Sequence, residues 1–173
     1  MLQLEKEKFV LNDLLNIQCE RILVYERLSN HPDFDHSICD FLKKIVVQSK
    51  NSLIDLRRHL DISLGDPAAK LRVNGDIYNN WREELSTVNT AEVINYCDKT
   101  EQATINAYMN ALGPGNKLSR EAKGVIATHL NMIKRIAGFI SECKQRPTTP
   151  EQVHEMGFPF VSSRENNLSF HLS

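Results

Sequence analysis

The sequence predicts an all-α fold, a single bundle of four amphipathic helices in which a long crossover joins the second helix to the third. Apolar residues recur at helical spacing in four long segments, and stretches rich in proline, glycine and small polar residues separate these segments. The chain has 173 residues, 41% of them hydrophobic, which is enough for one well-buried core. We therefore expect one domain over residues 1–146, followed by a tail of residues 147–173.

The first helix is predicted over residues 5–28. Its apolar residues form one stripe, and Asp13, Glu20 and Glu26 lie off that stripe. Pro32 ends the segment, because proline cannot continue a helix. The stripe comprises Val10, Leu11, Leu14, Ile17, Ile22, Tyr25 and Leu28.

The second helix is predicted over residues 36–60, with Asp35 as its N-cap. Ser49 is the only polar residue that we place inside its stripe. The connection from the first helix is short, so the two helices should lie side by side and antiparallel. The stripe comprises Ile38, Leu42, Ile45, Val46, Leu53, Leu56 and Leu60.

The link between the second and third helices has roughly 29 residues, where a simple bundle needs about 2 to 8. A helix of about 25 residues is roughly 37 Å long, and a link of this length can run back along it and still carry a short extra helix. We infer a crossover, so that the third helix runs parallel to the second. Trp81 should fix the crossover to the bundle; the alternative is an exposed Trp81 that binds a partner.

The third helix is predicted from an N-cap at Thr90 to Leu112, and the fourth from an N-cap at Ser119 to Lys144. The sequence Gly-Pro-Gly-Asn at residues 113–116 separates them. The apolar stripes comprise Ile94, Cys97, Thr104, Ile105, Tyr108 and Leu112 in the third helix, and Val125, Met132, Ile133, Ile136, Phe139, Ile140 and Cys143 in the fourth.

The tail has no clear periodicity. We expect an irregular segment, either docked on the bundle through Phe158 and Phe160 or partly disordered.

Composition argues against several partners. The net charge is −1, which gives no electrostatic footprint for nucleic acid or an anionic membrane. The apolar runs are far shorter than the roughly 20 residues that span a bilayer, so we expect a cytoplasmic protein. The four cysteines are widely spaced and form no CxxC pair, which predicts reduced side chains inside helices.

A four-helix bundle with one long crossover is typical of the ferritin-like class, which can hold a di-metal site. That site takes one Glu from each of two helices and Glu-x-x-His from each of the other two. Glu101 lies inside the stripe of the third helix and His129 inside that of the fourth, but Ile126 stands where the Glu of the motif should be. Only about one carboxylate faces inward where the site needs about four.

A buried Glu101 needs a partner, because an isolated charge in the core is costly. The first helix offers Gln18 and Arg21, while Glu20 points away; the second offers Ser49, with Gln48, Asn51 and Asp55 beside its stripe. We expect Arg21 or His129 to pair with Glu101, and Gln18 and Ser49 to add hydrogen bonds. The resulting polar layer would specify helix register and carry out no chemistry.

Two alternatives remain open for this layer. One is a degenerate single-metal site, with iron bound by Glu101 and His129. The other is a small-molecule pocket lined by Glu101, His129 and Tyr108.

The weaker candidates lie near the surface. Asp55 and His59 share a helix face at i,i+4, which can hold zinc but more often forms an ordinary helical pair. A crowded first loop could bind a surface metal, but its sequence is also typical of a turn and cap. The residues of this loop are His31, Asp33, Asp35 and His36. Phosphate-loop, nucleophile-elbow and catalytic-triad signatures are absent from the sequence.

Three stretches match a known pattern: residues 10–25 (VLNDLLNIQCERILVY), the piece around Trp81, and residues 91–112 (AEVINYCDKTEQATINAYMNAL). The matching positions in the third stretch are Cys97, Glu101, Ala107 and Tyr108. Over residues 8–144 the chain resembles the bacterial ferritin-like four-helix-bundle proteins of unknown function, a stress-associated family. The resemblance implies the fold, a cytoplasmic bacterial setting and self-association as a homo-oligomer. It departs from the family at Ile133, where a His is expected.

The sequence thus predicts a non-enzymatic, self-associating bundle with a structural polar layer and no cofactor. The alternative is an iron-binding oxidoreductase or iron-handling protein with a degenerate carboxylate and histidine site.

Overall fold

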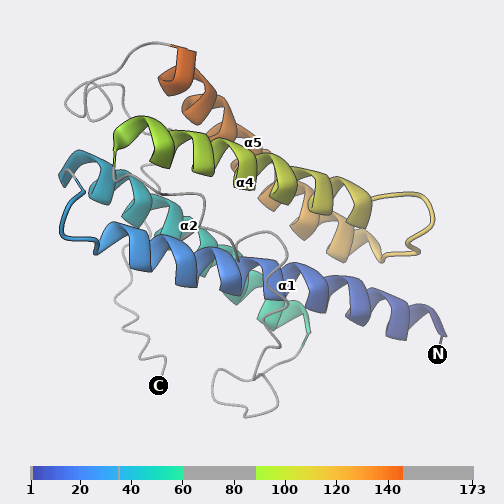
Figure 1. Ribbon diagram of the computed structural model, residues 1–173. Coiled ribbons are helices and arrows are strands. Elements are labelled where there is room, and N and C mark those ends of the chain that lie inside the picture. Colours follow the sequence, from blue (N-terminus) through green and yellow to red (C-terminus); the bar gives the residue numbers. More distant parts are fainter. Residues whose placement is uncertain (1, 35, 61–88, 146–173) are drawn as a thin grey trace.

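The computed structural model describes residues 2–34, 36–60 and 89–145, and these residues form four α-helices. They are α1 (Leu2–Ser29), α2 (His36–His59), α4 (Thr90–Ala111) and α5 (Arg120–Gln145) (Figure 1). The described ranges contain no strand, so the all-α prediction is confirmed.

The helices form two hairpins, α1 with α2 and α4 with α5, which contact each other through α1–α4 and α2–α5. One end of the core combines the C-terminal half of α1, the N-terminal halves of α2 and α4, and the C-terminal half of α5. The other half of each helix forms the core at the opposite end, together with Leu60 and Leu118. Consequently α2 and α4 begin at the same end of the bundle and run in the same direction (Figure 1).

The apolar stripes predicted from the sequence are the ones that the bundle covers. Most of their members are buried, and the exceptions are half-buried residues at the margins of the core. Those exceptions are Val10, Ile17, Leu53, Leu112, Val125 and Met132. The predicted link that contains Trp81, the boundary at residue 146 and the tail of residues 147–173 lie outside the described residues.

Both helices of the second hairpin begin at a side-chain cap. Ser119 Oγ accepts a hydrogen bond from the backbone N–H of Ala122 at 3.2 Å, as predicted for an N-cap. The predicted cap at Thr90 is wrong, because Thr90 is already helical. Asn89 is the N-cap instead, and its Oδ1 accepts from the N–H of Glu92 at 2.9 Å. The cap predicted at Asp35 lies outside the described residues.

A long-range contact joins the hairpins at the end where α1 begins. The carboxylate of Glu7 accepts hydrogen bonds from the backbone N–H of Ser119 and from its hydroxyl, the latter at 3.0 Å. A carboxylate at this position is also favoured by the partial positive charge at the N-terminus of α5. Figure 1 shows the α4–α5 loop at the same end as the N-terminus. Among the described residues, no helix is long and apolar enough to cross a bilayer.

Candidate functional site

An ion pair between Arg21 of α1 and Glu101 of α4 lies at the centre of the bundle. Two parallel hydrogen bonds join them, from Arg21 Nε to Glu101 Oε1 at 2.9 Å and from Arg21 Nη2 to Glu101 Oε2 at 2.6 Å. Both side chains are 0% exposed. This is the bidentate geometry in which two guanidinium N–H groups donate to the two oxygens of one carboxylate. Of the two partners that the sequence offered for Glu101, the structure places Arg21 against it.

Two side chains of α2 and the hydroxyl of Tyr25 on α1 complete this polar layer. Arg21 Nη1 donates to Gln48 Oε1 and to Ser49 Oγ, the latter at 2.9 Å. The hydroxyl of Tyr25 donates to Glu101 Oε1 at 2.9 Å. Both carboxylate oxygens and all three guanidinium nitrogens are therefore engaged within the protein.

The sequence missed part of this layer. Ser49 was placed as the only polar residue in the stripe of α2, which is wrong, because Gln48 and Ser52 are also buried, at 4% and 3% exposure. Position 48 is next to Ser49 in the stripe, and its side chain meets Arg21 of α1. Tyr25 was counted as apolar, yet a buried tyrosine usually needs a partner for its hydroxyl, and that signal could have found it.

A second polar cluster contains the buried Gln18, Tyr108 and His129 and the half-exposed Asp55. Gln18 Nε2 donates to the Tyr108 hydroxyl at 2.8 Å, so Gln18 does not support Glu101 as predicted. The ring of His129 meets the ring of Tyr108 edge to face, with centroids 6.1 Å apart. His129 Nε2 lies 3.4 Å from Asp55 Oδ2, within hydrogen-bond reach.

The ionisation state of His129 follows from its surroundings. The side chain is 3% exposed, and burial lowers its pKa, because removal from water disfavours the charged imidazolium. The Asp55 carboxylate raises the pKa by a smaller amount. His129 is therefore neutral at physiological pH.

Glu101 and His129, the two weak metal candidates, belong to different clusters. Glu101 contacts Arg21 and Tyr25, and His129 contacts Asp55. Within residues 2–34, 36–60 and 89–145 there is no group of three His, Cys, Asp or Glu side chains that could hold a metal ion. The described residues do not fit the ligand set of a ferritin-like di-metal centre.

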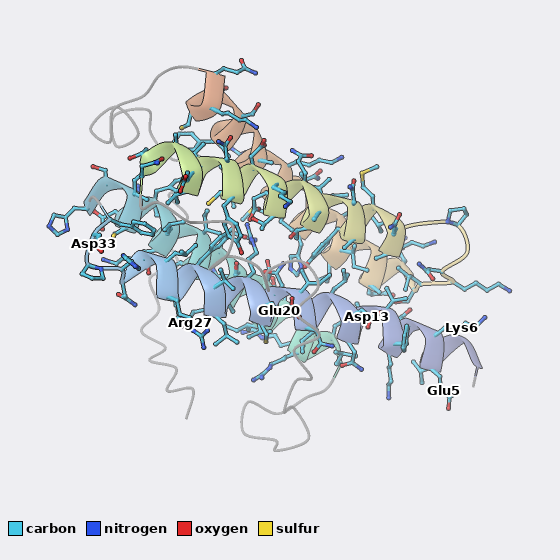
Figure 2. All side chains as sticks on the ribbon, viewed as in Figure 1. Glu5, Lys6, Asp13, Glu20, Arg27 and Asp33 are labelled. Carbon is cyan, nitrogen blue, oxygen red and sulfur yellow. The ribbon has the colours of Figure 1, made fainter. Side chains whose placement is uncertain are left out.

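The side chains at the other expected ligand positions explain why a di-metal ligand set is missing around Glu101 and His129. Ile126 and Ile133, which stand where ligands were expected, are both 0% exposed and apolar. Glu20, which was expected to lie off the stripe and point away, is instead only 3% exposed. Figure 2 shows the labelled charged side chains of α1, among them Glu20, spread along the length of the helix.

The surface candidates behave as ordinary helix and turn residues. Asp55 pairs with His129 and lies 3.9 Å from Arg58, so its recorded ion partners do not include His59. In the first loop, the N–H of Asp33 donates to His31 Nδ1 at 3.4 Å, and the His31 ring stacks on Phe34. This is a turn held by local contacts. Asp35 lies outside the described residues.

The cysteines lie in helices, as predicted, and none of the four forms a disulfide. Burial raises the pKa of Cys19 and of Cys143 to about 11, and it raises the pKa of Cys97 further. A thiol with a raised pKa holds little thiolate and reacts slowly. Cys19, Cys97 and Cys143 are therefore poor candidates for nucleophilic chemistry.

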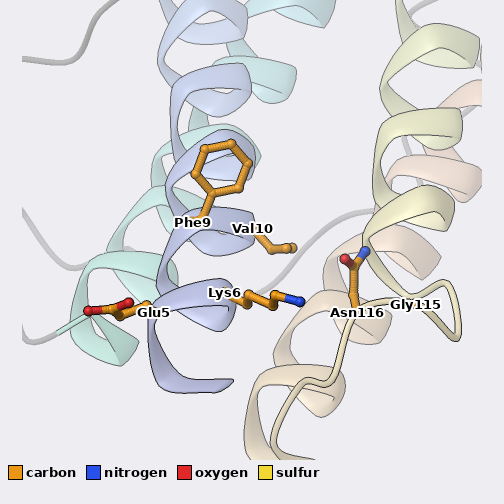
Figure 3. Close-up of a pocket in the computed structure, with 6 residues that line it drawn as sticks. All are labelled: Glu5, Lys6, Phe9, Val10, Gly115 and Asn116. Carbon is orange, nitrogen blue, oxygen red and sulfur yellow. The ribbon is translucent and has the colours of Figure 1, made fainter. Parts of the chain in front are cut away.

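An open groove lies between the start of α1 and the α4–α5 loop. Its volume is about 390 Å³, and Figure 3 shows Lys6 extending from α1 toward Gly115 and Asn116. A second hollow of about 230 Å³ lies on α4, next to Glu92 and Tyr96. Neither is lined by the three residues of the small-molecule pocket considered above.

Comparisons of the chain with protein-family models, with curated proteins and with solved structures found no match. The ferritin-like family therefore remains an inference from the sequence pattern.

Proposed function

We propose that this protein is a non-enzymatic bundle of the ferritin-like class that works through self-association, and that its polar layer is structural. The observation that supports the proposal is the pairing of Glu101. Arg21 and Tyr25 occupy both of its oxygens, and the pair is 0% exposed.

A metal ion at Glu101 would have to displace the guanidinium. Arg21 would then keep its charge in a site without water, and an uncompensated buried charge costs about 3–5 kcal/mol. The hydrogen bonds from Arg21 to Gln48 and Ser49 on α2 oppose this displacement further, since they hold the guanidinium in place. The layer thus favours a salt bridge over a metal site.

The ferritin-like assignment draws on topology. The parallel direction of α2 and α4, and the long link between them, are what one long crossover produces. Self-association rests on the family resemblance, together with the exposed Leu4 and Phe9 at one end of α1, which are 59% and 68% exposed. A cytoplasmic, stress-associated role is part of the same resemblance.

The test is elemental analysis of full-length protein purified without chelator, combined with an iron(II) titration and sedimentation velocity over a range of concentrations. We expect far less than one metal ion per chain, no saturable iron binding, and concentration-dependent association.

A stoichiometric metal, lost in Glu101→Ala or His129→Ala, would overturn the proposal and favour the iron-handling alternative. A species that stays monomeric at every concentration would overturn the self-association. The exposed substitution Glu121→Ala is the matched control, because it removes a carboxylate from the first turn of α5 without touching either buried cluster.

A further inference from the structure

Three neighbouring buried side chains keep polar groups without partners in the described part of the chain. Gln18 and Tyr108 are 0% exposed and His129 is 3% exposed. Gln18 Oε1 and His129 Nδ1 have no hydrogen-bond partner there. The Tyr108 hydroxyl accepts from Gln18 Nε2, and the same ranges offer no acceptor for its own proton. Buried polar groups rarely lack a hydrogen-bond partner, so each of these three groups needs an explanation.

The tautomer of His129 is set by Asp55. An ionised carboxylate can only accept hydrogen bonds, so the nitrogen that faces Asp55 Oδ2, Nε2, carries the proton. The ring is neutral, because burial lowers its pKa. Nδ1 is therefore a bare acceptor inside the bundle.

The three groups together present two acceptors, Gln18 Oε1 and His129 Nδ1, and one donor, the Tyr108 hydroxyl. Water has two donors and two acceptor lone pairs, so one molecule can satisfy all three. None of the three groups is charged, so an ion placed among them would exchange its hydration for neutral ligands only. The pattern of two acceptors and one donor matches a neutral molecule that both donates and accepts hydrogen bonds, as water does.

We propose that Gln18, Tyr108 and His129 form a binding site for one internal water molecule, which donates to Gln18 Oε1 and His129 Nδ1 and accepts from the Tyr108 hydroxyl. The site joins α1, α4 and α5 through the water, and α2 through the contact between His129 and Asp55. It is a second polar layer, distinct from that of Arg21 and Glu101.

The test is NMR of the labelled full-length chain, with water as the probe. Water-selective NOE spectra should show a long-lived water close to the His129 ring and the Tyr108 hydroxyl, and the nitrogen-15 shifts of His129 should report the Nε2–H tautomer. In Gln18→Met the water cross-peak should be lost and the Nδ1 resonance should move. The matched control is Gln102→Met, at an exposed position of α4, which should change neither.

Three results in the wild-type protein would overturn the proposal: no water cross-peak, an Nδ1–H tautomer, or NOEs that place a side chain of residues 61–88 or 146–173 against His129 Nδ1. These measurements need no variant, so they decide the question even if Gln18→Met does not fold.

Discussion

Glu101 and Arg21 are 0% exposed and neutralise each other, so removing one charge should cost more than removing both. In Glu101→Gln the guanidinium remains buried without a counter-charge. We expect the free energy of unfolding to fall by about 3–5 kcal/mol, measured by urea denaturation. The double variant Arg21→Met/Glu101→Leu should recover most of this loss, because it removes both desolvation costs.

The matched control is Asp98→Asn, which breaks the partly exposed pair between Asp98 of α4 and Lys144 of α5. Its cost should stay within about 1 kcal/mol. If Glu101→Gln cost no more than Asp98→Asn, the central pair would not be the constraint that its burial indicates.

His129 should make the protein sensitive to acid. Its pKa in the folded state is lowered by burial from the ordinary value of 6.5, so the unfolded chain takes up a proton at a higher pH than the folded protein does. Well above pH 6.5 both states are deprotonated at this site, and His129 adds no pH dependence. As the pH falls below that value, the unfolded state gains the proton first and stability declines.

This decline can be measured by chemical denaturation at a series of pH values between neutral and acidic. His129→Gln should flatten the slope over that window, because the neutral amide does not titrate there. Asn131→Gln, at an exposed position of α5, adds and removes no titrating group and should keep the wild-type slope. An unchanged slope in His129→Gln would contradict the prediction.

At the scale of single elements, the start of α4 depends on one side chain. Asn89 Oδ1 accepts from the N–H of Glu92 at 2.9 Å, and loss of such a cap costs about 0.5–2 kcal/mol. Asn89→Ala should therefore lower the thermal midpoint, measured by circular dichroism. Asn89→Asp, which keeps the acceptor, should preserve it, and Thr90→Ala should cost less, since Thr90 is already helical. An equal loss in Asn89→Asp and Asn89→Ala would contradict the capping role.

The helices themselves were predictable because each carries a long apolar stripe, and stripe spacing is a local property of the sequence. The residues at which the helices begin and end were less predictable. The pair Asn89 and Thr90 offers two good N-caps in succession, and only the backbone conformation decides between them. At the end of α4, Asn116 Nδ2 donates to the carbonyls of Asn110 and Ala111, a cap contributed by a loop residue that spacing does not reveal.

At the scale of the whole molecule, sequence reasoning found Glu101 and offered Arg21 as its partner, because a charge inside an apolar stripe needs a counter-charge. It also offered Ser49, which accepts a hydrogen bond from Arg21, but it placed Gln48 beside the stripe and counted Tyr25 as apolar. Gln48 reaches Arg21 only when α1 and α2 pack, and the Tyr25 hydroxyl reaches Glu101 only when α1 and α4 pack. Glu7 reaches Ser119 from another hairpin. These contacts depend on the relative placement of helices, which periodicity within one helix does not encode.

The central pair also has a consequence for the order of folding. Arg21 belongs to the α1–α2 hairpin and Glu101 to the α4–α5 hairpin, and each hairpin can close through local contacts before the two meet. Docking is then the step that strips water from both charges. A slip of one helical turn, about 5.4 Å, would separate the two charges and leave each buried without its counter-charge. The need for the two charges to meet therefore favours the aligned docking of the two hairpins over a misaligned one.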